Sequence, residues 1–185
     1  MPYRIDEIMA IADRYEIPVI EDAAEGFGSR YNGQMLGTFG RYGALSFNGN
    51  KMITTSGGGA LICSPTSEQD GWGGADTIMW YATQARESYP YYQHEKIGYN
   101  YRMSNICAGI GRGQMTVANK HIEHHKHVQS LYEELLADVP GITVHSQPNS
   151  NVNPNANLNA NDDVDVNRKF DSNYWLCTIT LAPEL

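Results

Sequence analysis

The chain has 185 residues, 41% hydrophobic and 18% charged, so it is long enough for a domain with a hydrophobic core and too apolar for a disordered protein. Its formal charge of -8 argues against a nucleic-acid partner, because phosphate binding needs clustered Lys and Arg. No apolar run is long enough to cross a bilayer, and Cys63, Cys107 and Cys177 fit neither a disulfide framework nor a CxxC metal site. We therefore expect a globular protein of the reducing cytoplasm, with no nucleic-acid or membrane partner.

The first residues are typical of an α/β fold. Apolar side chains in residues 3–15 recur at helical spacing, and residues 18–20 follow as a short buried strand. The strand ends in the acidic pair Glu21 and Asp22. A helix that leads directly into a short apolar strand favours a parallel sheet.

Glycine-rich turns are expected at residues 26–43, before two strands at 43–47 and 59–63. Residues 65–101 mix helix signals with aromatic-rich loop. Residues 104–138 are predicted to be mostly helical, with Ser104 or Asn105 as the N-cap.

The C-terminal part changes in character. A strand is expected at residues 142–145, and an Asn-rich, poorly ordered loop at 147–167. Alternating apolar residues predict a last strand at 174–181. We divide the chain into part of a large cofactor-binding domain (1–138) and the start of a small C-terminal domain (139–185), and we expect it to be a fragment.

Three side chains attract attention, although each alone has an ordinary explanation. Asp22 follows a strand, at the edge where open α/β sheets bind ligands, but it could also cap a helix that begins at residue 23. Lys51 lies between a strand and three glycines, where the backbone can approach an anionic cofactor, yet a surface lysine would be commoner. Ser46 could donate its hydroxyl to a phosphate, but alone it would be an ordinary strand serine. His121 and His125 are spaced as metal ligands on one helix face, but no third ligand is evident, so no metal site is predicted.

Taken together, these residues belong to longer segments that follow one another in a specific order. The segments are EDAAE (21–25), GTFG (37–40), SFNGNK (46–51), TTSGGG (54–59) and GYNYRMSN (98–105). They resemble the DegT/DnrJ/EryC1/StrS family of sugar aminotransferases, and the resemblance covers residues 3 to about 146 and resumes near 172.

The resemblance implies a fold-type I aminotransferase: a three-layer α/β/α large domain, a smaller C-terminal domain and a homodimer. Lys51 would form a Schiff base with pyridoxal 5'-phosphate and would then move a proton during amino transfer. Asp22 would pair with the pyridine nitrogen and keep the ring cationic, which makes the ring an electron sink. Ser46 would bind the cofactor phosphate, and Asn100 would reach the phosphate in the other subunit.

Glu25 departs from the family pattern, in which Gln commonly lies near the 3-hydroxyl of the cofactor. We count Glu25 among the cofactor-binding residues and leave its role open. Residues 80–86 also resemble the branch that acts on UDP-linked 4-keto-6-deoxy-N-acetylhexosamines, which implies a UDP-4-amino-4,6-dideoxy-N-acetylhexosamine transaminase.

The resemblance implies transfer of an amino group from an amino acid, with glutamate as the expected donor, to a 4-keto or 3-keto sugar nucleotide. The same fold includes sugar dehydratases with histidine at the lysine position, which Lys51 argues against. The alternative to an enzyme fragment is a catalytically silent truncated chain or a dimerisation remnant.

Overall fold

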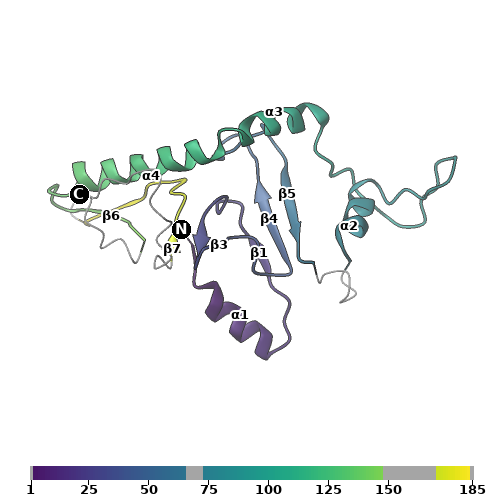
Figure 1. Cartoon of the computed structure of the whole chain (residues 1–185), viewed down its shortest axis with the longest axis horizontal. Coiled ribbons are helices and arrows are strands. Elements are labelled where there is room, and N and C mark those ends of the chain that lie inside the picture. Colours follow the sequence, from purple (N-terminus) through teal and green to yellow (C-terminus); the bar gives the residue numbers. More distant parts are fainter. Residues whose placement is uncertain (1, 66–72, 148–169, 184–185) are drawn as a thin grey trace.

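The computed structural model describes residues 2–65, 73–147 and 170–183, as a mixed α/β structure (Figure 1). The helices of this part are α1 (Ile5–Arg14), α2 (Ala75–Ala82), α3 (Asn105–Met115) and α4 (Ala118–Leu135). Its strands are β1 (Ile20–Asp22), β2 (Arg30–Tyr31), β3 (Gln34–Met35), β4 (Tyr42–Ser46), β5 (Gly59–Cys63), β6 (Ile142–Val144), β7 (Phe170–Asp171) and β8 (Ile179–Leu181).

The sheet that carries the candidate site has the strand order β1-β4-β5. Strands β1 and β4 are parallel, with Asp22 opposite Ala44, whereas β4 and β5 are antiparallel, with Ser46 opposite Gly59. The prediction of a parallel sheet is therefore wrong for β5. A loop at residues 47–58 lets the chain turn back, so that β5 runs antiparallel beside β4. The predicted strands at 43–47 and 59–63 are both present.

Strand β1 lies two residues later than the predicted strand at 18–20, and its apolar residue is not the buried one. Ile20 is 66% exposed, whereas Glu21 is 2% exposed. The Glu21 carboxylate accepts hydrogen bonds from the backbone amides of Gly37, Phe39 and Gly40 at 2.6–2.8 Å. A buried carboxylate is tolerated when such donors replace water, so the bonds explain why the acid points inward.

The glycine-rich segment folds into the predicted turns and a short hairpin. Asn32 and Gly33 both have positive φ values, of 48° and 79°, as a two-residue Asn-Gly hairpin turn requires. Strand β2 pairs with β3 on one side and with β7 on the other, so Arg30 lies opposite both Met35 and Asp171. The hairpin thus joins the start of the chain to residues near its end.

The hydrophobic core lies between this hairpin and α1. Tyr31 is fully buried and meets Phe170 edge to face, with ring centroids 5.0 Å apart. Ile5, Ala23 and Leu36 complete the buried cluster. The predicted helix at residues 3–15 is therefore present as α1, and its first residue, Ile5, packs into this cluster. This cluster fixes the loop after β1, which carries the candidate site residues.

Helices α3 and α4 form most of the predicted helical segment 104–138. The Ser104 side chain accepts a hydrogen bond of 3.2 Å from the amide of Cys107, which confirms Ser104 as the N-cap of α3. The two helices are separate, and α4 extends along one edge of the molecule above the hairpin (Figure 1). Within the described residues, no helix is both long enough and apolar enough to span a bilayer.

The last strand is shorter than predicted. Only β8 (Ile179–Leu181) forms from the expected 174–181 strand, and it pairs with β6. The residues before it are not extended, because Asn173 and Trp175 donate hydrogen bonds to the backbone of Glu25 and Asn50, respectively. The predicted Asn-rich loop at 147–167 lies outside the described residues apart from Gln147, and the domain division at 138/139 stays a prediction.

Candidate functional site

Asp22 lies at the carboxyl end of β1, beside the neighbouring parallel strand β4. Its carboxylate accepts a hydrogen bond of 3.2 Å from the amide of Ala24, so it stabilises a turn rather than the N-terminus of a helix. The side chain is exposed, and one of its two carboxylate oxygens makes this turn contact. Asp22 is thus placed at the sheet edge that the sequence predicted.

Ser46 ends β4 and begins the loop that carries Lys51. The Ser46 hydroxyl accepts a hydrogen bond of 3.3 Å from the amide of Asn48, and the amide of Lys51 donates to the carbonyl of Asn48 at 3.0 Å. The amide of Thr55 bonds back to the carbonyl of Phe47 at 2.9 Å, which closes the loop. Because β1 and β4 are parallel, Asp22 and Ser46 come to the same edge of the sheet.

Lys51 reaches from this loop to the loop that follows Asp22. Its Nζ atom lies 3.5 Å from Oε1 of Glu25, and its side chain is 14% exposed. On another side, Nζ lies 4.3 Å from the centre of the Trp175 ring. The structure therefore joins the predicted residues 51 and 25 directly, and it adds an aromatic residue that the sequence did not indicate.

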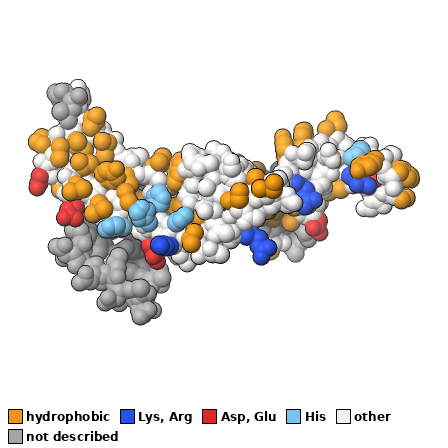
Figure 2. All heavy atoms as spheres, turned by 90° about the horizontal axis from the view of Figure 1, so that it is seen from above, with side chains coloured by type: hydrophobic (Ala, Val, Ile, Leu, Met, Phe, Trp, Pro, Cys, Tyr) orange, Lys and Arg blue, Asp and Glu red, His pale blue; other side chains and the backbone are white. Residues whose placement is uncertain are grey.

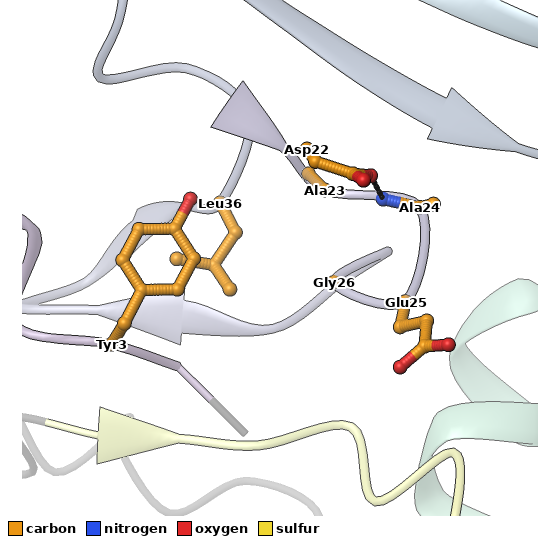
Figure 3. Close-up of a pocket in the computed structure, with 7 residues that line it drawn as sticks. All are labelled: Tyr3, Asp22, Ala23, Ala24, Glu25, Gly26 and Leu36. Atoms are coloured by element: carbon orange, nitrogen blue, oxygen red, sulfur yellow. Dashed lines mark hydrogen bonds between the residues drawn. The ribbon is translucent and has the colours of Figure 1, made fainter. Parts of the chain in front are cut away.

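A cavity of about 390 Å³ opens beside the same loop and is lined by Tyr3, Asp22, Ala23, Ala24, Glu25, Gly26 and Leu36. Figure 3 shows that Asp22 and Glu25 extend from this loop in different directions. Lys51 is not one of the lining residues. We therefore place the candidate site at the loop of residues 22–25, with the cavity beside it, rather than in the cavity alone.

Asn100 lies elsewhere in the described structure, on the exposed segment between α2 and α3. It forms an isolated antiparallel β-bridge with Thr83, which directly follows the last residue of α2. Asn100 is therefore held by α2, whereas Asp22, Ser46, Glu25 and Lys51 are arranged around the edge of β1 and β4. The prediction that Asn100 serves the other subunit stays a prediction.

Sequence reasoning missed the segment of residues 172–175. The amide of Asn173 donates to the Ser29 hydroxyl at 2.9 Å, and its side-chain amide donates to the carbonyls of Glu25 and Phe27 at 2.9 Å. Trp175 then donates from Nε1 to the carbonyl of Asn50, also at 2.9 Å. No local pattern indicates contacts that span about 125 to 148 residues of sequence.

The histidines of α4 do not form a metal site in the part of the chain that the structure describes. His121 approaches the carbonyl of Met52 through Nδ1 at 3.2 Å, which links α4 to the Lys51 loop. Burial lowers the pKa of His125, against an opposing hydrogen bond with the backbone of Tyr174.

Burial also raises the pKa of Tyr3, whose hydroxyl donates to Glu21 at 2.9 Å.

Comparison with solved structures shows the fold. The aminotransferase TlmJ of Streptoalloteichus hindustanus matches with a TM-score of 0.77 at 18% identity, over 97% of this chain and 43% of that chain. A DegT DnrJ EryC1 StrS aminotransferase of Brucella abortus matches with a TM-score of 0.74 at 23% identity, over 97% and 41%. The predicted aminotransferase fold class is confirmed.

Sequence comparison identifies the family. EpsN of Bacillus subtilis (strain 168), which is named as a pyridoxal phosphate-dependent aminotransferase, is 39% identical over 96% of this chain and 39% of its own length. GDP-perosamine synthase of Escherichia coli O157:H7 is 35% identical over 79% of this chain and 38% of its own length. The chain therefore spans about two fifths of these relatives. Residues 1–169 match the family model, and the chain belongs to the DegT/DnrJ/EryC1/StrS aminotransferase family.

Proposed function

We propose that this chain forms the cofactor-binding part of a pyridoxal 5'-phosphate-dependent aminotransferase that acts on keto sugar nucleotides. The observation that carries the proposal is the contact between Lys51 and Glu25, 3.5 Å apart, on the loop that begins with Asp22. An amine and a carboxylate thereby meet on the loop that follows Asp22, at the carboxyl end of β1 beside its parallel neighbour β4, and open α/β sheets bind ligands at this edge.

The donor set fits the cofactor. An aldehyde requires an amine, which Lys51 provides, and a protonated pyridine nitrogen requires a carboxylate, which Asp22 provides. A phosphate accepts hydrogen bonds, and the Ser46 hydroxyl has a proton to donate while its oxygen accepts from Asn48. Glu25 would lie near the 3-hydroxyl of the cofactor, where its carboxyl group could take part in a hydrogen bond. The cofactor supplies the electron sink that stabilises negative charge on the substrate carbon.

We propose separate roles for Lys51 and Asp22 in the reaction. Lys51 would hold the cofactor through its amine and would be the group that takes up and returns a proton at the substrate carbon. Asp22 would hold the proton on the pyridine nitrogen, because a carboxylate beside that atom favours its charged form. The turn bond from Ala24 would keep the carboxylate of Asp22 in one orientation.

The substrate class is supported by the names of the relatives. They include GDP-perosamine synthases and, at 28% identity, a UDP-4-amino-4,6-dideoxy-N-acetyl-beta-L-altrosamine transaminase of Campylobacter jejuni. We propose that this protein likewise aminates a 4-keto or 3-keto sugar nucleotide in the cytoplasm. Glutamate is the amino donor that we propose.

A second copy of the chain is the proposed partner. Figure 2 shows hydrophobic side chains gathered toward both ends of the face that carries α3 and α4. Several large apolar side chains of the described residues are more than two-thirds exposed: Tyr92, Ile97, Tyr101, Ile106 and Leu135. Exposed apolar area of this kind supports a protein interface. Asn100 lies among these residues in sequence, in accord with a role at the partner's cofactor phosphate.

The test is transfer of a labelled amino group. The whole protein, loaded with pyridoxal 5'-phosphate, is incubated with ¹⁵N-glutamate and a panel of UDP-, GDP- and TDP-linked keto sugars. Mass spectrometry should detect a ¹⁵N-amino sugar nucleotide that is absent with Lys51→Ala. Assembly into dimers without any amino transfer, by protein that carries the cofactor, would instead support a silent dimerisation role.

A further inference from the structure

The amine of Lys51 lies between two different groups, a carboxylate and an aromatic ring. Glu25 Oε1 is 3.5 Å from Nζ on one side, and the centre of the Trp175 ring is 4.3 Å from Nζ on another. The side chain of Glu25 is 63% exposed, and exposed ion pairs hold a lysine only weakly. The low exposure of the Lys51 side chain, 14%, therefore needs a second group, and the indole ring is in the position to cover it.

The ring of Trp175 is itself held in place. Its Nε1 atom donates to the carbonyl of Asn50, the residue next to Lys51, at 2.9 Å. Its backbone amide donates to the side chain of Asn173 at 3.0 Å, and Asn173 is 2% exposed. Asn173 in turn donates to the carbonyl of Glu25 at 2.9 Å. One buried residue thus ties together the two groups that flank the amine.

We infer that Trp175 is a positioning residue for Lys51: without cofactor, the indole face and the Glu25 carboxylate hold the lysine as a shielded ammonium against the loop of residues 22–25. A cation over the face of an indole is attracted by the negative face of the ring. The inference deepens the proposed function and rests on it only for the role of Lys51. It makes a segment more than 120 residues downstream part of the site.

Pulse labelling of lysines in the cofactor-free protein tests the shielding. An amine-reactive acetylating reagent is applied briefly, and the modified fraction of each lysine is measured by mass spectrometry. Trp175→Leu removes both the ring and the Asn50 bond, so Lys51 should react about two- to fivefold faster, the factor that corresponds to an exposed cation–π contact. Trp175→Phe keeps an aromatic face and should retain most of the protection.

Trp80 offers a matched control. Its Nε1 atom also donates to a backbone carbonyl at 2.9 Å, that of Arg86. Trp80→Leu should therefore cost a comparable hydrogen bond without changing the labelling of Lys51. A purely structural role for Trp175 predicts equal effects of the Phe and Leu substitutions at this position. A Lys51 rate that changes no more in Trp175→Leu than in Trp80→Leu would overturn the inference.

A second measurement needs no tryptophan variant. Lysines of the cofactor-free protein are reductively methylated with ¹³C, and the Lys51 resonance is assigned by its loss in Lys51→Arg. Protons over the face of an indole ring shift upfield, so this resonance should lie upfield of those from Lys96 and Lys120. A Lys51 resonance at the same position as theirs would refute the inference even if Trp175→Leu fails to fold. Because neither measurement uses cofactor, an upfield Lys51 that never binds pyridoxal phosphate would refute only the proposed function.

Discussion

The side-chain amide of Asn173 donates a hydrogen bond of 2.9 Å to the backbone carbonyl of Glu25, 148 residues earlier in the chain. A second bond from the same amide goes to the carbonyl of Phe27. The loop that carries Glu25 is therefore held by a segment near the other end of the sequence. Through Trp175, the same segment also reaches the residue next to Lys51.

Asn173→Ala should destabilise the protein, because it removes the two hydrogen bonds that this buried side chain donates to the carbonyls of Glu25 and Phe27. Unmade hydrogen bonds of this kind cost about 1–3 kcal/mol, measured as the free energy of unfolding in urea. Asn173→Asp separates the two kinds of bond. Aspartate can still accept the hydrogen bond from the amide of Trp175, but it cannot donate to the two carbonyls. Asn119→Ala, at an exposed position of α4, should be neutral or slightly stabilising. Equal stability of Asn173→Ala and Asn119→Ala would contradict this account of the loop.

Glu21→Gln should also weaken the fold. The carboxylate accepts from Tyr3 and Gly37 through one oxygen and from Phe39 and Gly40 through the other. Glutamine would turn an NH₂ group toward N–H donors on one side, and hydrogen bonds to charged groups contribute about 1.5–3 kcal/mol each. Tyr3→Phe removes one donor only and should cost less. A Glu21→Gln variant as stable as Tyr3→Phe in urea unfolding would show that the amide bonds matter little.

Gly43→Ala should be severely destabilising. A Cβ atom at this buried position of β4 would overlap the carbonyl oxygen of Gly37, and backbone cannot move aside cheaply. The expected loss is at or above the upper end of the about 1–3 kcal/mol typical of overpacking. In α3, Gly109→Ala meets nothing within 4 Å and should gain about 0.5–1 kcal/mol, because glycine is a poor helix former. Thermal unfolding of the two variants should shift in opposite directions.

Stability should fall on mild acidification, in part through His125. Burial lowers the pKa of His125 in the folded state below its ordinary value of about 6.5, so the unfolded chain takes up its proton first. The contribution of this group is fully present above about pH 6.5 and is lost as the pH falls through the lower folded value. His125→Gln should therefore reduce the difference between unfolding midpoints at about pH 7.5 and about pH 5.5. His127 is exposed on the same helix, so His127→Gln is the matched control. The difference between the two midpoints should be larger in His127→Gln than in His125→Gln.

The sequence predicted the parts of the fold that depend on local patterns. The spacing of apolar residues located α1, the serine cap located the start of α3, and the run of residues 59–63 matched β5 exactly in its bounds. It failed where a distant contact decides the conformation. The sequence predicts that Ile20 is buried, but Glu21 is buried instead, because backbone amides from residues 37–40 donate hydrogen bonds to its carboxylate.

The candidate site divides in the same way. Asp22 could be placed because a strand end determines which edge of the sheet a residue reaches. Family resemblance placed Lys51 and Glu25 at one cofactor site, but their direct contact was not predicted, because it requires two separate loops to meet. Trp175 falls in a predicted strand, because nothing in residues 174–181 indicates that its ring bonds to Asn50.

The most direct test of the central claim is to locate the lysine that binds pyridoxal 5'-phosphate. The whole protein is incubated with the cofactor, reduced with borohydride and digested, and the modified peptide is identified by mass spectrometry. The adduct should lie on Lys51, and Lys51→Ala should lose both the adduct and the associated absorbance band while keeping its fold. An adduct on Lys96, Lys120 or Lys126 instead, or no adduct on a folded whole protein, would contradict the proposed role of Lys51.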